Sequence, residues 1–273
     1  MITYNALKVD GLKDVLQNIA TACDHLNIDF FVVGAVARNI WYVHGGKESR
    51  GTQDIDFGVY VPDHETYDDL KNYLTENFKY TQAQDNIFGL DTPEGKGIDL
   101  LPFGEIAEND EVVMEGRGMT KIKLDGFKEA YLNGSINTNI EEEAYKACSI
   151  PGIVILKLIA YDDRPDRRTK DIKDISLICK YFPDIETNLI WEEHYDLYEE
   201  DRSHDEVGYI VLGREMKKII KDNNGLFERV YDILNKAING QSGVLELMIN
   251  DRIQETLDQK VRILECIKEG LGH

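Results

Sequence analysis

Two aspartates, Asp54 and Asp56, are separated by a single residue, a spacing that could serve chemistry on a phosphate-bearing substrate. Apolar residues alternate with them from 55 to 61, which predicts a strand with both carboxylates on one face. Upstream, an apolar run at 30–33 meets Gly34-Ala35 and a predicted helix, and a helix N-terminus after such a turn can bind phosphate. The combination is typical of metal-assisted chemistry on a nucleotide.

Composition alone produces many such pairs, because the chain is rich in acid. With 51 Asp and Glu among 273 residues, roughly nine acid-x-acid pairs are expected. The pairs Glu108/Asp110, Glu141/Glu143 and Glu199/Asp201 stand in polar surroundings and are interpreted as solvated. Asp54 and Asp56 differ because they interrupt an apolar strand, where a carboxylate without a partner is costly. We therefore take Asp54 and Asp56 as candidate catalytic and metal-binding residues.

Asp99 supplies a candidate third ligand. It lies in Gly97-Ile-Asp-Leu-Leu-Pro-Phe103, which follows a polar turn and is predicted to be a second, largely buried strand. Three carboxylates on adjacent strands could hold two Mg²⁺ ions, with Mn²⁺ as a substitute, since hard cations prefer oxygen ligands. Such ions activate an attacking hydroxyl and stabilise the leaving pyrophosphate. The alternative is that Asp99 caps or pairs with a nearby Arg or Lys.

A second candidate cluster lies in the C-terminal half of the chain. Pro151 opens an apolar segment that predicts a largely buried helix containing Lys157. A lysine at such a position either extends its ammonium to solvent or meets an anion. Asp171 and Asp174 lie one turn apart on the next predicted helix and can share a face. The arginines at 164, 167 and 168 either form salt bridges or face a phosphate.

The order of these motifs resembles the DNA polymerase beta nucleotidyltransferase superfamily. A Gly-Gly or Gly-Ser turn, a helix, an Asp-x-Asp strand and a later lone Asp follow one another there, and Gly34-Ala35 takes the place of the turn here. Residues 33–39 are also similar to the related element of tRNA-terminal nucleotidyltransferases. Two further stretches, over roughly residues 30 to 180, resemble AbiEii-type abortive-infection nucleotidyltransferases, which are toxins of bacterial toxin–antitoxin pairs or their solitary relatives. These stretches are Arg50-x-Thr52-x-Asp54-Ile-Asp56-Phe and Lys157-x-x-Ala…Arg164…Lys170-Asp171-x-x-Asp174.

The resemblance implies a role for each motif. Asp54 and Asp56 would bind both metals, and Asp99 would bind the catalytic metal and assist deprotonation of the acceptor. Lys157 would contact the nucleotide phosphates, with Asp171 or Asp174 as the supporting acid. The other nucleotide-binding residues would be Gly34, Ala35, Arg50 and Thr52. Ala35 offers a backbone N–H but no hydroxyl, so a phosphate contact from a serine side chain is absent.

The expected function is a metal-dependent nucleotidyltransferase. It would move an NMP group from an NTP to an acceptor hydroxyl, release pyrophosphate, and act as a toxin on tRNA, another RNA or a protein, with an antitoxin protein as partner. Two alternatives stay open. The acidic surface favours a cationic small molecule such as an aminoglycoside as acceptor, and Ala35 suggests a catalytically degenerate module that binds a nucleotide or a partner.

Composition also indicates the cellular compartment and the kinds of partner that this protein is expected to have. No apolar run is long enough to span a bilayer and no signal-peptide pattern opens the chain, so we expect a cytoplasmic protein without membrane contact. The four cysteines lie far apart and are expected to be buried reduced thiols. A net charge of −20 argues against a broad nucleic-acid surface, although residues 164–173 and 214–221 are locally basic. No histidine is assigned a metal, and His194 and His204 are expected at the surface.

The fold class expected for this chain is α+β. We expect an α/β nucleotidyltransferase core with a mixed sheet over residues 1–147, and a helical domain over 148–273 that completes the nucleotide site. Residues 111–114 and 122–124 are expected to extend the sheet. Residues 192–205 are expected to form an acidic surface loop, and Ser242–Glu269 a helix.

Overall fold

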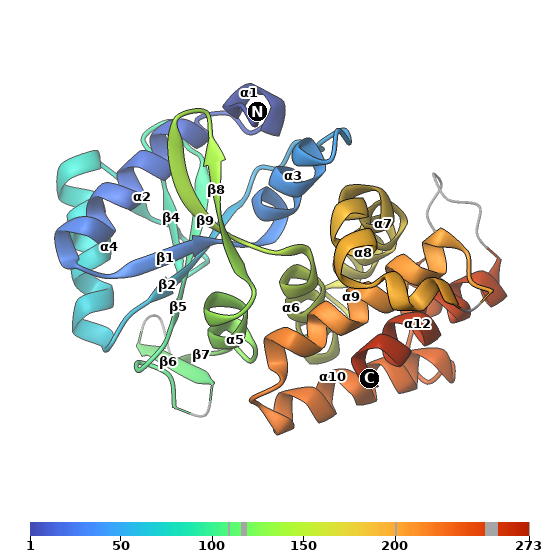
Figure 1. The fold of residues 1–273 in the computed structure, drawn as a ribbon. Helices are drawn as coiled ribbons and strands as arrows, with labels where there is room; N and C mark the ends of the chain where they lie inside the picture. Colours follow the sequence, from blue (N-terminus) through green and yellow to red (C-terminus); the bar gives the residue numbers. More distant parts are fainter. Residues whose placement is uncertain (109, 116–118, 200, 249–255, 273) are drawn as a thin grey trace. The chain divides into compact units, whose positions relative to one another are not determined.

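The computed structural model describes residues 1–272 except 109, 116–118, 200 and 249–255 (Figure 1). The chain divides into two compact units. Unit 1 comprises Met1–His44, Glu48–Tyr131 and Ser135–Ser149, and unit 2 comprises Gly45–Lys47, Leu132–Gly134 and Ile150–His273. No helix in the described ranges has the length and apolar character needed to cross a membrane.

Unit 1 is built on a seven-stranded mixed sheet with strand order β3-β4-β5-β2-β1-β9-β8 (Figure 1). The pairs β2/β5 and β1/β9 are parallel, and the other neighbours are antiparallel. The strands are β1 Asp29–Val32, β2 Ile55–Tyr60, β3 Thr81–Gln82, β4 Gly89–Asp91, β5 Gly97–Phe103, β8 Ser135–Ile140 and β9 Glu143–Cys148. The two middle strands that carry the candidate aspartates, β2 and β5, are therefore direct neighbours.

The core of unit 1 lies between this sheet and its helices. Ile55, Phe57 and Val59 of β2 are fully buried, as their alternation with polar residues predicts. Helices α2 and α4 lie side by side, and α3 packs on β2 (Figure 1). The N-terminus of α4 is capped by the Asp63 side chain, which accepts from the backbone N–H of Thr66. The helices are α1 Tyr4–Leu7, α2 Leu12–Leu26, α3 Gly34–His44, α4 His64–Phe78 and α5 Phe127–Leu132.

Unit 2 is helical. Its α9 and α12 lie side by side and cross closely (Figure 1). Gly213 and Gly270 make the crossing possible, because a Cβ on either glycine would overlap a backbone carbonyl of the facing helix. The elements are α6 Ile150–Asp163, α7 Thr169–Ile185, α8 Thr187–Glu193, the 3₁₀ helix η1 Tyr195–Glu199, α9 His204–Ile220, α10 Asn224–Ile238, α11 Val244–Leu247 and α12 Leu257–Gly272.

The predicted α+β fold class is confirmed, with a mixed sheet followed by a helical region. The expectation that residues 111–114 and 122–124 extend the main sheet is wrong, because β6 (Glu111–Glu115) and β7 (Met119–Lys123) pair with each other in a separate two-stranded sheet. The main sheet instead includes the hairpin β8/β9, which lies at its edge. The four cysteines are buried as predicted, with no disulfide among the described residues.

Two further expectations in the C-terminal half are wrong. Residues 192–205 are not a simple loop, because they contain the end of α8, all of η1 and the start of α9. The helix expected over Ser242–Glu269 is divided into α11 and α12, and residues 249–255 lie outside the described ones. The domain boundary between residues 147 and 148, and the contribution of the second domain to a nucleotide site, stay predictions.

Candidate active site

Asp56 and Asp99 are direct partners on neighbouring strands. The parallel register of β2 and β5 pairs Asp56 with Asp99, and register partners direct their side chains to the same face of a sheet. Both residues are partly exposed, whereas the residues before and after them, such as Ile55 and Ile98, are buried. The structure therefore brings two of the three candidate aspartates together on the more open face of two core strands.

Asp54 stands just outside this pair. Strand β2 begins at Ile55, so Asp54 belongs to the irregular segment before it, and its side chain is exposed. The hydroxyl of Thr52 donates to the backbone carbonyl of Asp54 at 3.2 Å. Within the described part of the chain, the three aspartates do not form a group whose ligand atoms all lie within 4.8 Å of one another. Of the three, Asp56 and Asp99 are the ones that the strand register pairs.

A neutral amide orients Asp99. The Asn86 side chain donates from Nδ2 to Asp99 Oδ1 at 2.7 Å, and Asn86 Oδ1 accepts from the backbone N–H of Phe88 at 3.0 Å. Asn86 is thus fixed at both ends of its amide and holds one carboxylate oxygen in place. No local sequence pattern marks Asn86 as a residue of the site.

Gly34 lies directly against the carboxylate of Asp56. Its φ of +63° is in the left-handed region that favours glycine, and a Cβ there would overlap Asp56 Oδ2. The backbone N–H of the preceding residue, Val33, donates to the carbonyl of Asp56 at 3.0 Å. Helix α3 starts at this glycine. The backbone N–H groups of its first turn, including that of Ala35, therefore lie next to the sheet face that carries Asp56.

A buried asparagine fixes the segment that carries Arg50 and Thr52. Asn39 of α3 is fully buried and donates to the backbone carbonyls of Arg50, at 2.7 Å, and Leu7, at 3.3 Å. Its own carbonyl accepts from the buried guanidinium of Arg38 at 3.0 Å. The backbone carbonyl of Thr52 accepts from Lys96 at 3.4 Å. Asn39 therefore links the segment that precedes Asp54 to α3, the helix that begins at Gly34. No sequence pattern predicted this link.

In unit 2, Lys157 of α6 is held between two aspartates of α7. Its Nζ lies 2.6 Å from Asp171 Oδ1 and 3.0 Å from Asp174 Oδ2. All three side chains are nearly buried, with 11 % to 13 % of their surface exposed. Of the two alternatives for this lysine, extension to solvent is wrong. It meets an anion, and that anion is a pair of carboxylates one helical turn apart.

The basic residues beside this cluster are exposed. They occupy the turn after α6 and the first turns of α7, and are Arg164, Arg167, Arg168, Lys170 and Lys173. Their ion pairs are long: Arg167 lies 3.7 Å from Asp166 and Arg168 lies 3.9 Å from Asp171. Exposed pairs of this kind contribute little to stability. The strip thus presents positive charge to solvent.

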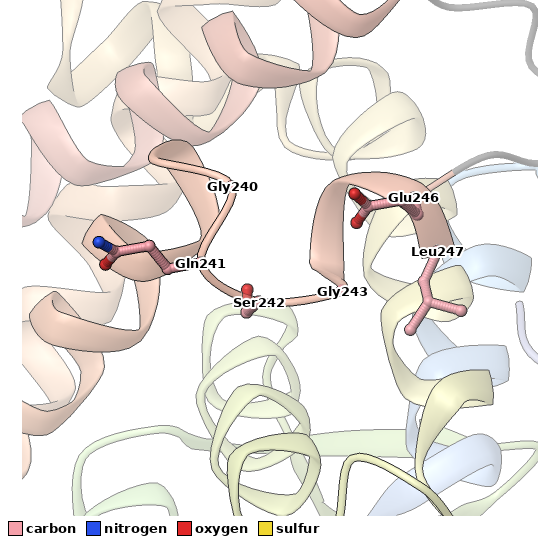
Figure 2. A pocket seen from close by; sticks show the side chains of 6 residues that line it. All are labelled: Gly240, Gln241, Ser242, Gly243, Glu246 and Leu247. Carbon is pink, nitrogen blue, oxygen red and sulfur yellow. The ribbon is translucent and has the colours of Figure 1, made fainter.

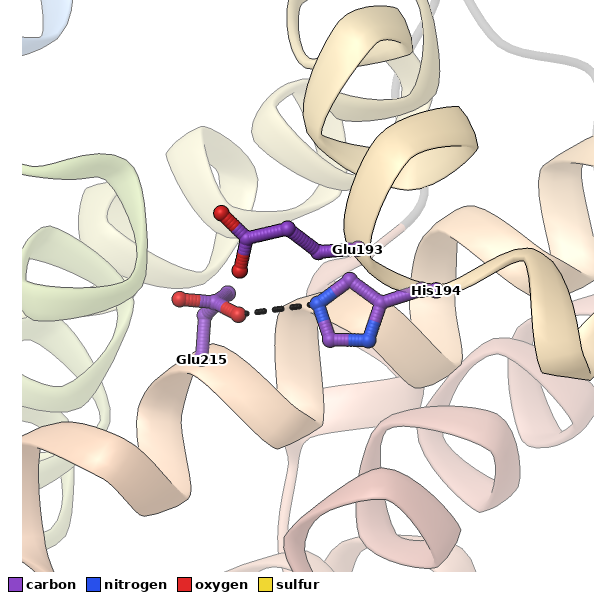
Figure 3. Close-up of side chains that lie close together, drawn as sticks. All are labelled: Glu193, His194 and Glu215. Carbon is purple, nitrogen blue, oxygen red and sulfur yellow. Dashed lines mark hydrogen bonds and ion pairs between the residues drawn. The ribbon is translucent and has the colours of Figure 1, made fainter.

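The expectation that His194 is a surface residue is wrong. It is buried between charged side chains, and its Nε2 lies 3.0 Å from Glu215 Oε1 (Figure 3). The guanidinium of Arg214 approaches its Nδ1 at 3.3 Å and can only donate, so Nδ1 accepts and the Nε2–H donates to Glu215. Glu193, His194 and Glu215 bring three ligand atoms within 4.8 Å. Lys218 already bridges Glu193 and Glu215, at 3.3 Å and 2.6 Å, so the arrangement is an ion-pair network.

Neither of two surface hollows is lined by a candidate residue. One, of about 550 Å³ in unit 2, follows the loop between α10 and α11 and is lined by Gly240, Gln241, Ser242, Gly243, Glu246 and Leu247 (Figure 2). The other, of about 420 Å³ in unit 1, is lined by Asp24, Asn27, Ile28, Asp29, Tyr60, Pro62 and Glu105. Asp29 and Tyr60 pair at one end of the β1/β2 ladder, and Val32 and Phe57 pair at the opposite end.

Three solved structures are similar to this chain at low identity. The solution structure of the antibiotic-resistance factor ANT(2″)-Ia has a TM-score of 0.41 and 16 % identity, and the match covers 68 % of this chain and 94 % of that one. The crystal structure of ANT(2″)-Ia in complex with adenylyl-2″-tobramycin has a TM-score of 0.39 and 17 % identity, and the match covers 61 % of this chain and 87 % of that one. The crystal structure of an antigenic nucleotidyltransferase-like protein from Paracoccidioides brasiliensis has a TM-score of 0.39 and 19 % identity, and the match covers 72 % of this chain and 93 % of that one. Comparison with curated proteins gives no match.

The sequence itself defines the class. The family described as "Nucleotidyl transferase AbiEii toxin, Type IV TA system" matches residues 17–245, which is most of the chain. The protein is therefore a nucleotidyltransferase. It belongs to the AbiEii family, which confirms the predicted resemblance and extends it beyond the stretch of roughly 30 to 180 that the motifs cover.

Proposed function

We propose that this nucleotidyltransferase is metal-dependent and transfers an NMP group from an NTP to a hydroxyl of an RNA acceptor, with release of pyrophosphate. The observation that carries the proposal is the register of Asp56 with Asp99, beside a glycine whose left-handed conformation leaves room for the Asp56 carboxylate. This arrangement opens the first turn of a helix toward paired carboxylates, which suits a triphosphate and its counter-ions.

The donor set fits hard divalent cations. Asp54, Asp56 and Asp99 offer only carboxylate oxygens, the ligands that Mg²⁺ prefers and Mn²⁺ accepts. Asp54 and Asp56 would hold both ions and Asp99 one of them. Asp54 is exposed and outside the strand, so packing does not fix its rotamer. When bound, the ions neutralise charge on the triphosphate and lower the pKa of the attacking hydroxyl.

The residues of the chain perform the remaining steps. Asp99 takes the proton of the acceptor hydroxyl, and Asn86 keeps that carboxylate oriented. The acceptor oxygen forms a bond to the α-phosphorus as the bond to the pyrophosphate oxygen breaks in line. Backbone N–H groups at Gly34 and Ala35, with Arg50 and Thr52, bind the triphosphate oxygens. Ala35 contributes only its backbone here, so its missing hydroxyl removes one contact and no chemical step.

Lys157 is proposed to contact nucleotide phosphates. An ammonium has three N–H donors, and Asp171 and Asp174 accept two of them. The third donor can reach a phosphate oxygen without breaking the pair of ion contacts. Asp171 and Asp174 would then be positioning residues that fix the ammonium.

An RNA acceptor is favoured by the exposed basic strip of unit 2. At a net charge of −20, most of the surface repels polyanions, so a local strip must provide the attraction. The strip of Arg164, Arg167, Arg168, Lys170 and Lys173 is exposed, and its ion pairs within the described part of the chain are long. A toxin role, and a cognate antitoxin, are proposed from the family description.

The test is a transfer assay with labelled nucleotides. The purified protein is incubated with each α-labelled NTP and a cell extract, with Mg²⁺ or Mn²⁺, and the labelled product is identified. A matched reaction with γ-labelled NTP follows the release of pyrophosphate. We expect the α-label on RNA and the γ-label in pyrophosphate, and no label with Asp56→Asn.

Each other outcome contradicts part of the proposal. Label on a small cationic molecule or on a protein would replace the RNA acceptor. Transfer of the γ-label would exclude nucleotidyl transfer. Absence of any transfer while the NTP still binds would favour the degenerate nucleotide-binding alternative. Full activity with a chelator present would exclude metal dependence.

A further inference from the structure

An exposed aromatic stack covers the end of α8 and the 3₁₀ helix η1. The rings of Trp191 and Tyr198 lie parallel, with centroids 4.2 Å apart and an interplanar angle of 4°. The His204 ring lies beside that of Tyr198 in nearly the same plane, with its Nδ1 2.5 Å from the Tyr198 hydroxyl. Trp191 is 54 % exposed and Tyr195 is 66 % exposed, which makes them the only large aromatics among the exposed hydrophobic residues of the described chain. Large exposed aromatics of this kind are typical of interaction sites.

Ion pairs anchor this segment to α9. Arg214 donates twice to the Asp196 carboxylate, at 3.0 Å and 2.8 Å. The network of the exposed Glu193, the buried His194 and the partly buried Glu215 joins the end of α8 to the same helix (Figure 3). The aromatic stack is therefore held in one place before any partner arrives. A surface fixed in this way loses little conformational entropy on binding.

The charges around the stack are negative. Lys218 and Arg214 of α9 pair with Glu193 and Asp196, whereas Glu192, Asp201 and Asp205 are exposed acids of the same segment, 192–205, which contains a single arginine, Arg202. That arginine is engaged with Glu269 at 2.8 Å. Glu192 and Asp205 are exposed, and neither has a hydrogen bond or ion pair among the described residues. The surface therefore repels nucleic acid and anionic lipid, and attracts cations.

We propose that this aromatic–acidic surface, formed by Trp191, Glu192, Tyr195, Tyr198 and Asp205, docks an arginine-rich segment of another protein. Guanidinium groups stack on the exposed indole and phenol rings and pair with carboxylates, so arginine uses both features of the surface. Lysine, a point charge, uses mainly the carboxylates. The proposal does not depend on the proposed nucleotidyl transfer.

The surface is distinct from the basic strip within unit 2. The strip begins at the N-terminus of α7, and the aromatic–acidic surface follows its C-terminus. The 17 residues of α7 separate its ends by about 25 Å. An arginine-rich segment and an RNA would therefore bind different ends of this helix.

The experiment measures the affinity of a labelled twelve-residue arginine–glycine peptide for the full chain by fluorescence anisotropy. We expect saturable binding that is weakened about tenfold by Trp191→Ala and about tenfold by Glu192→Gln with Asp205→Asn. The matched control is Asp68→Asn with Asp69→Asn on α4, which removes the same charge from exposed residues elsewhere. The control should change the affinity by less than about twofold.

Several results would overturn the assignment. If the control weakens binding as much as the Glu192 and Asp205 changes do, the attraction is only that of the net charge. If Trp191→Ala leaves the affinity unchanged, or if a lysine–glycine peptide binds as tightly as the arginine peptide, the aromatic stack is not a docking surface for guanidinium groups. Circular dichroism of each variant shows that the fold is retained, and the acid-neutralised variant tests the surface independently of Trp191.

Discussion

Two pairs of aspartates are brought together in different ways in the two units. Asp56 and Asp99 meet across parallel strands, and Asp171 and Asp174 meet across one turn of a helix. The helical pair shares the ammonium of Lys157 and is nearly buried. The strand pair is partly exposed, and Asp99 is oriented by the neutral amide of Asn86.

The two pairs of aspartates are expected to affect activity and folding stability differently. A buried ion cluster depends on all its members, because removing one leaves an uncompensated charge in a poorly solvated place. Two carboxylates in register on neighbouring strands repel each other, and removing one of the two charges lowers that repulsion. The strand pair should therefore control activity, and the helical cluster should control folding as well as phosphate binding.

The largest effect is expected on activity when the strand pair is altered. Asp56→Asn should lower kcat/KM by more than about a thousandfold, because a carboxylate metal ligand is lost at a nearly isosteric side chain. The melting temperature should hold or rise, since repulsion within the pair falls. Transfer kinetics and thermal unfolding measure the two effects separately.

Asp69→Asn on α4 serves as the control, because it removes one exposed carboxylate of the same unit. Its activity should stay at the wild-type level. Wild-type turnover in Asp56→Asn would remove the two-metal assignment, and a large loss of stability would show that Asp56 is a structural residue.

A smaller but still large effect is expected on stability when the helical cluster is altered. Lys157→Met should lower the free energy of unfolding by about 3 kcal/mol, because Asp171 and Asp174 are left nearly buried without their cation. Nucleotide binding should also weaken if the third donor of the ammonium reaches a phosphate. Urea unfolding and calorimetric titration with NTP measure the two quantities.

A compensated variant separates the two roles of Lys157. Adding Asp171→Asn and Asp174→Asn to Lys157→Met should recover most of the stability, because no buried charge remains. Nucleotide binding should stay weak in that variant. Lys180→Met, which changes an exposed lysine on α7, the helix of Asp171 and Asp174, is the matched control and should change neither quantity. Recovery of nucleotide affinity in the compensated variant would show that Lys157 acts only on the fold.

The two pairs also differ in how much the sequence could predict. Alternation of apolar and acidic residues predicts the face that Asp56 occupies, because a strand has a period of two. The register with Asp99 depends on the pairing of distant strands, and the sequence could only suggest that the strands are adjacent. Whether Lys157 reaches solvent or an anion depends on how α6 and α7 pack, so local periodicity left both alternatives open. The burial of His194 likewise comes from α9, a helix ten residues further along the chain.

The same limit explains the errors in the fold. The β8/β9 hairpin lies at the edge of the sheet and its polar residues carry little strand signal, whereas the apolar run at 112–114 in β6 resembles a core strand although β6 and β7 pair only with each other. Helix α12 follows the predicted amphipathic pattern, but nothing in that pattern marks where α11 ends. Sequence periodicity predicts which face of a helix or strand is buried, but not which other element that face packs against.

A moderate effect is expected at the basic strip beside the helical cluster. Arg167→Gln with Arg168→Gln should weaken tRNA binding by roughly tenfold at low salt and reduce the salt slope by about 1.4, for two lost phosphate contacts. Filter binding across a salt series measures both. The control is Lys217→Gln with Lys221→Gln in the other locally basic segment, where no change is expected. Absence of tRNA binding at any salt would remove the RNA acceptor.

The smallest effect concerns a third way of holding a carboxylate. Glu143 accepts hydrogen bonds from Tyr145, Tyr4 and Gln17, at 2.5, 2.6 and 2.5 Å, and these neutral donors lower its pKa to about 2. Because the folded pKa lies below the usual 4.5, the stabilisation is present above pH 4.5 and is lost as the pH falls toward 2. Glu143 is partly exposed, so solvent screening keeps the effect below about 1 kcal/mol. Urea unfolding of Glu143→Gln should show a deficit relative to wild type near neutral pH that shrinks in acid. A deficit independent of pH would mean that the hydrogen bonds, and not the charge, stabilise this corner of the sheet.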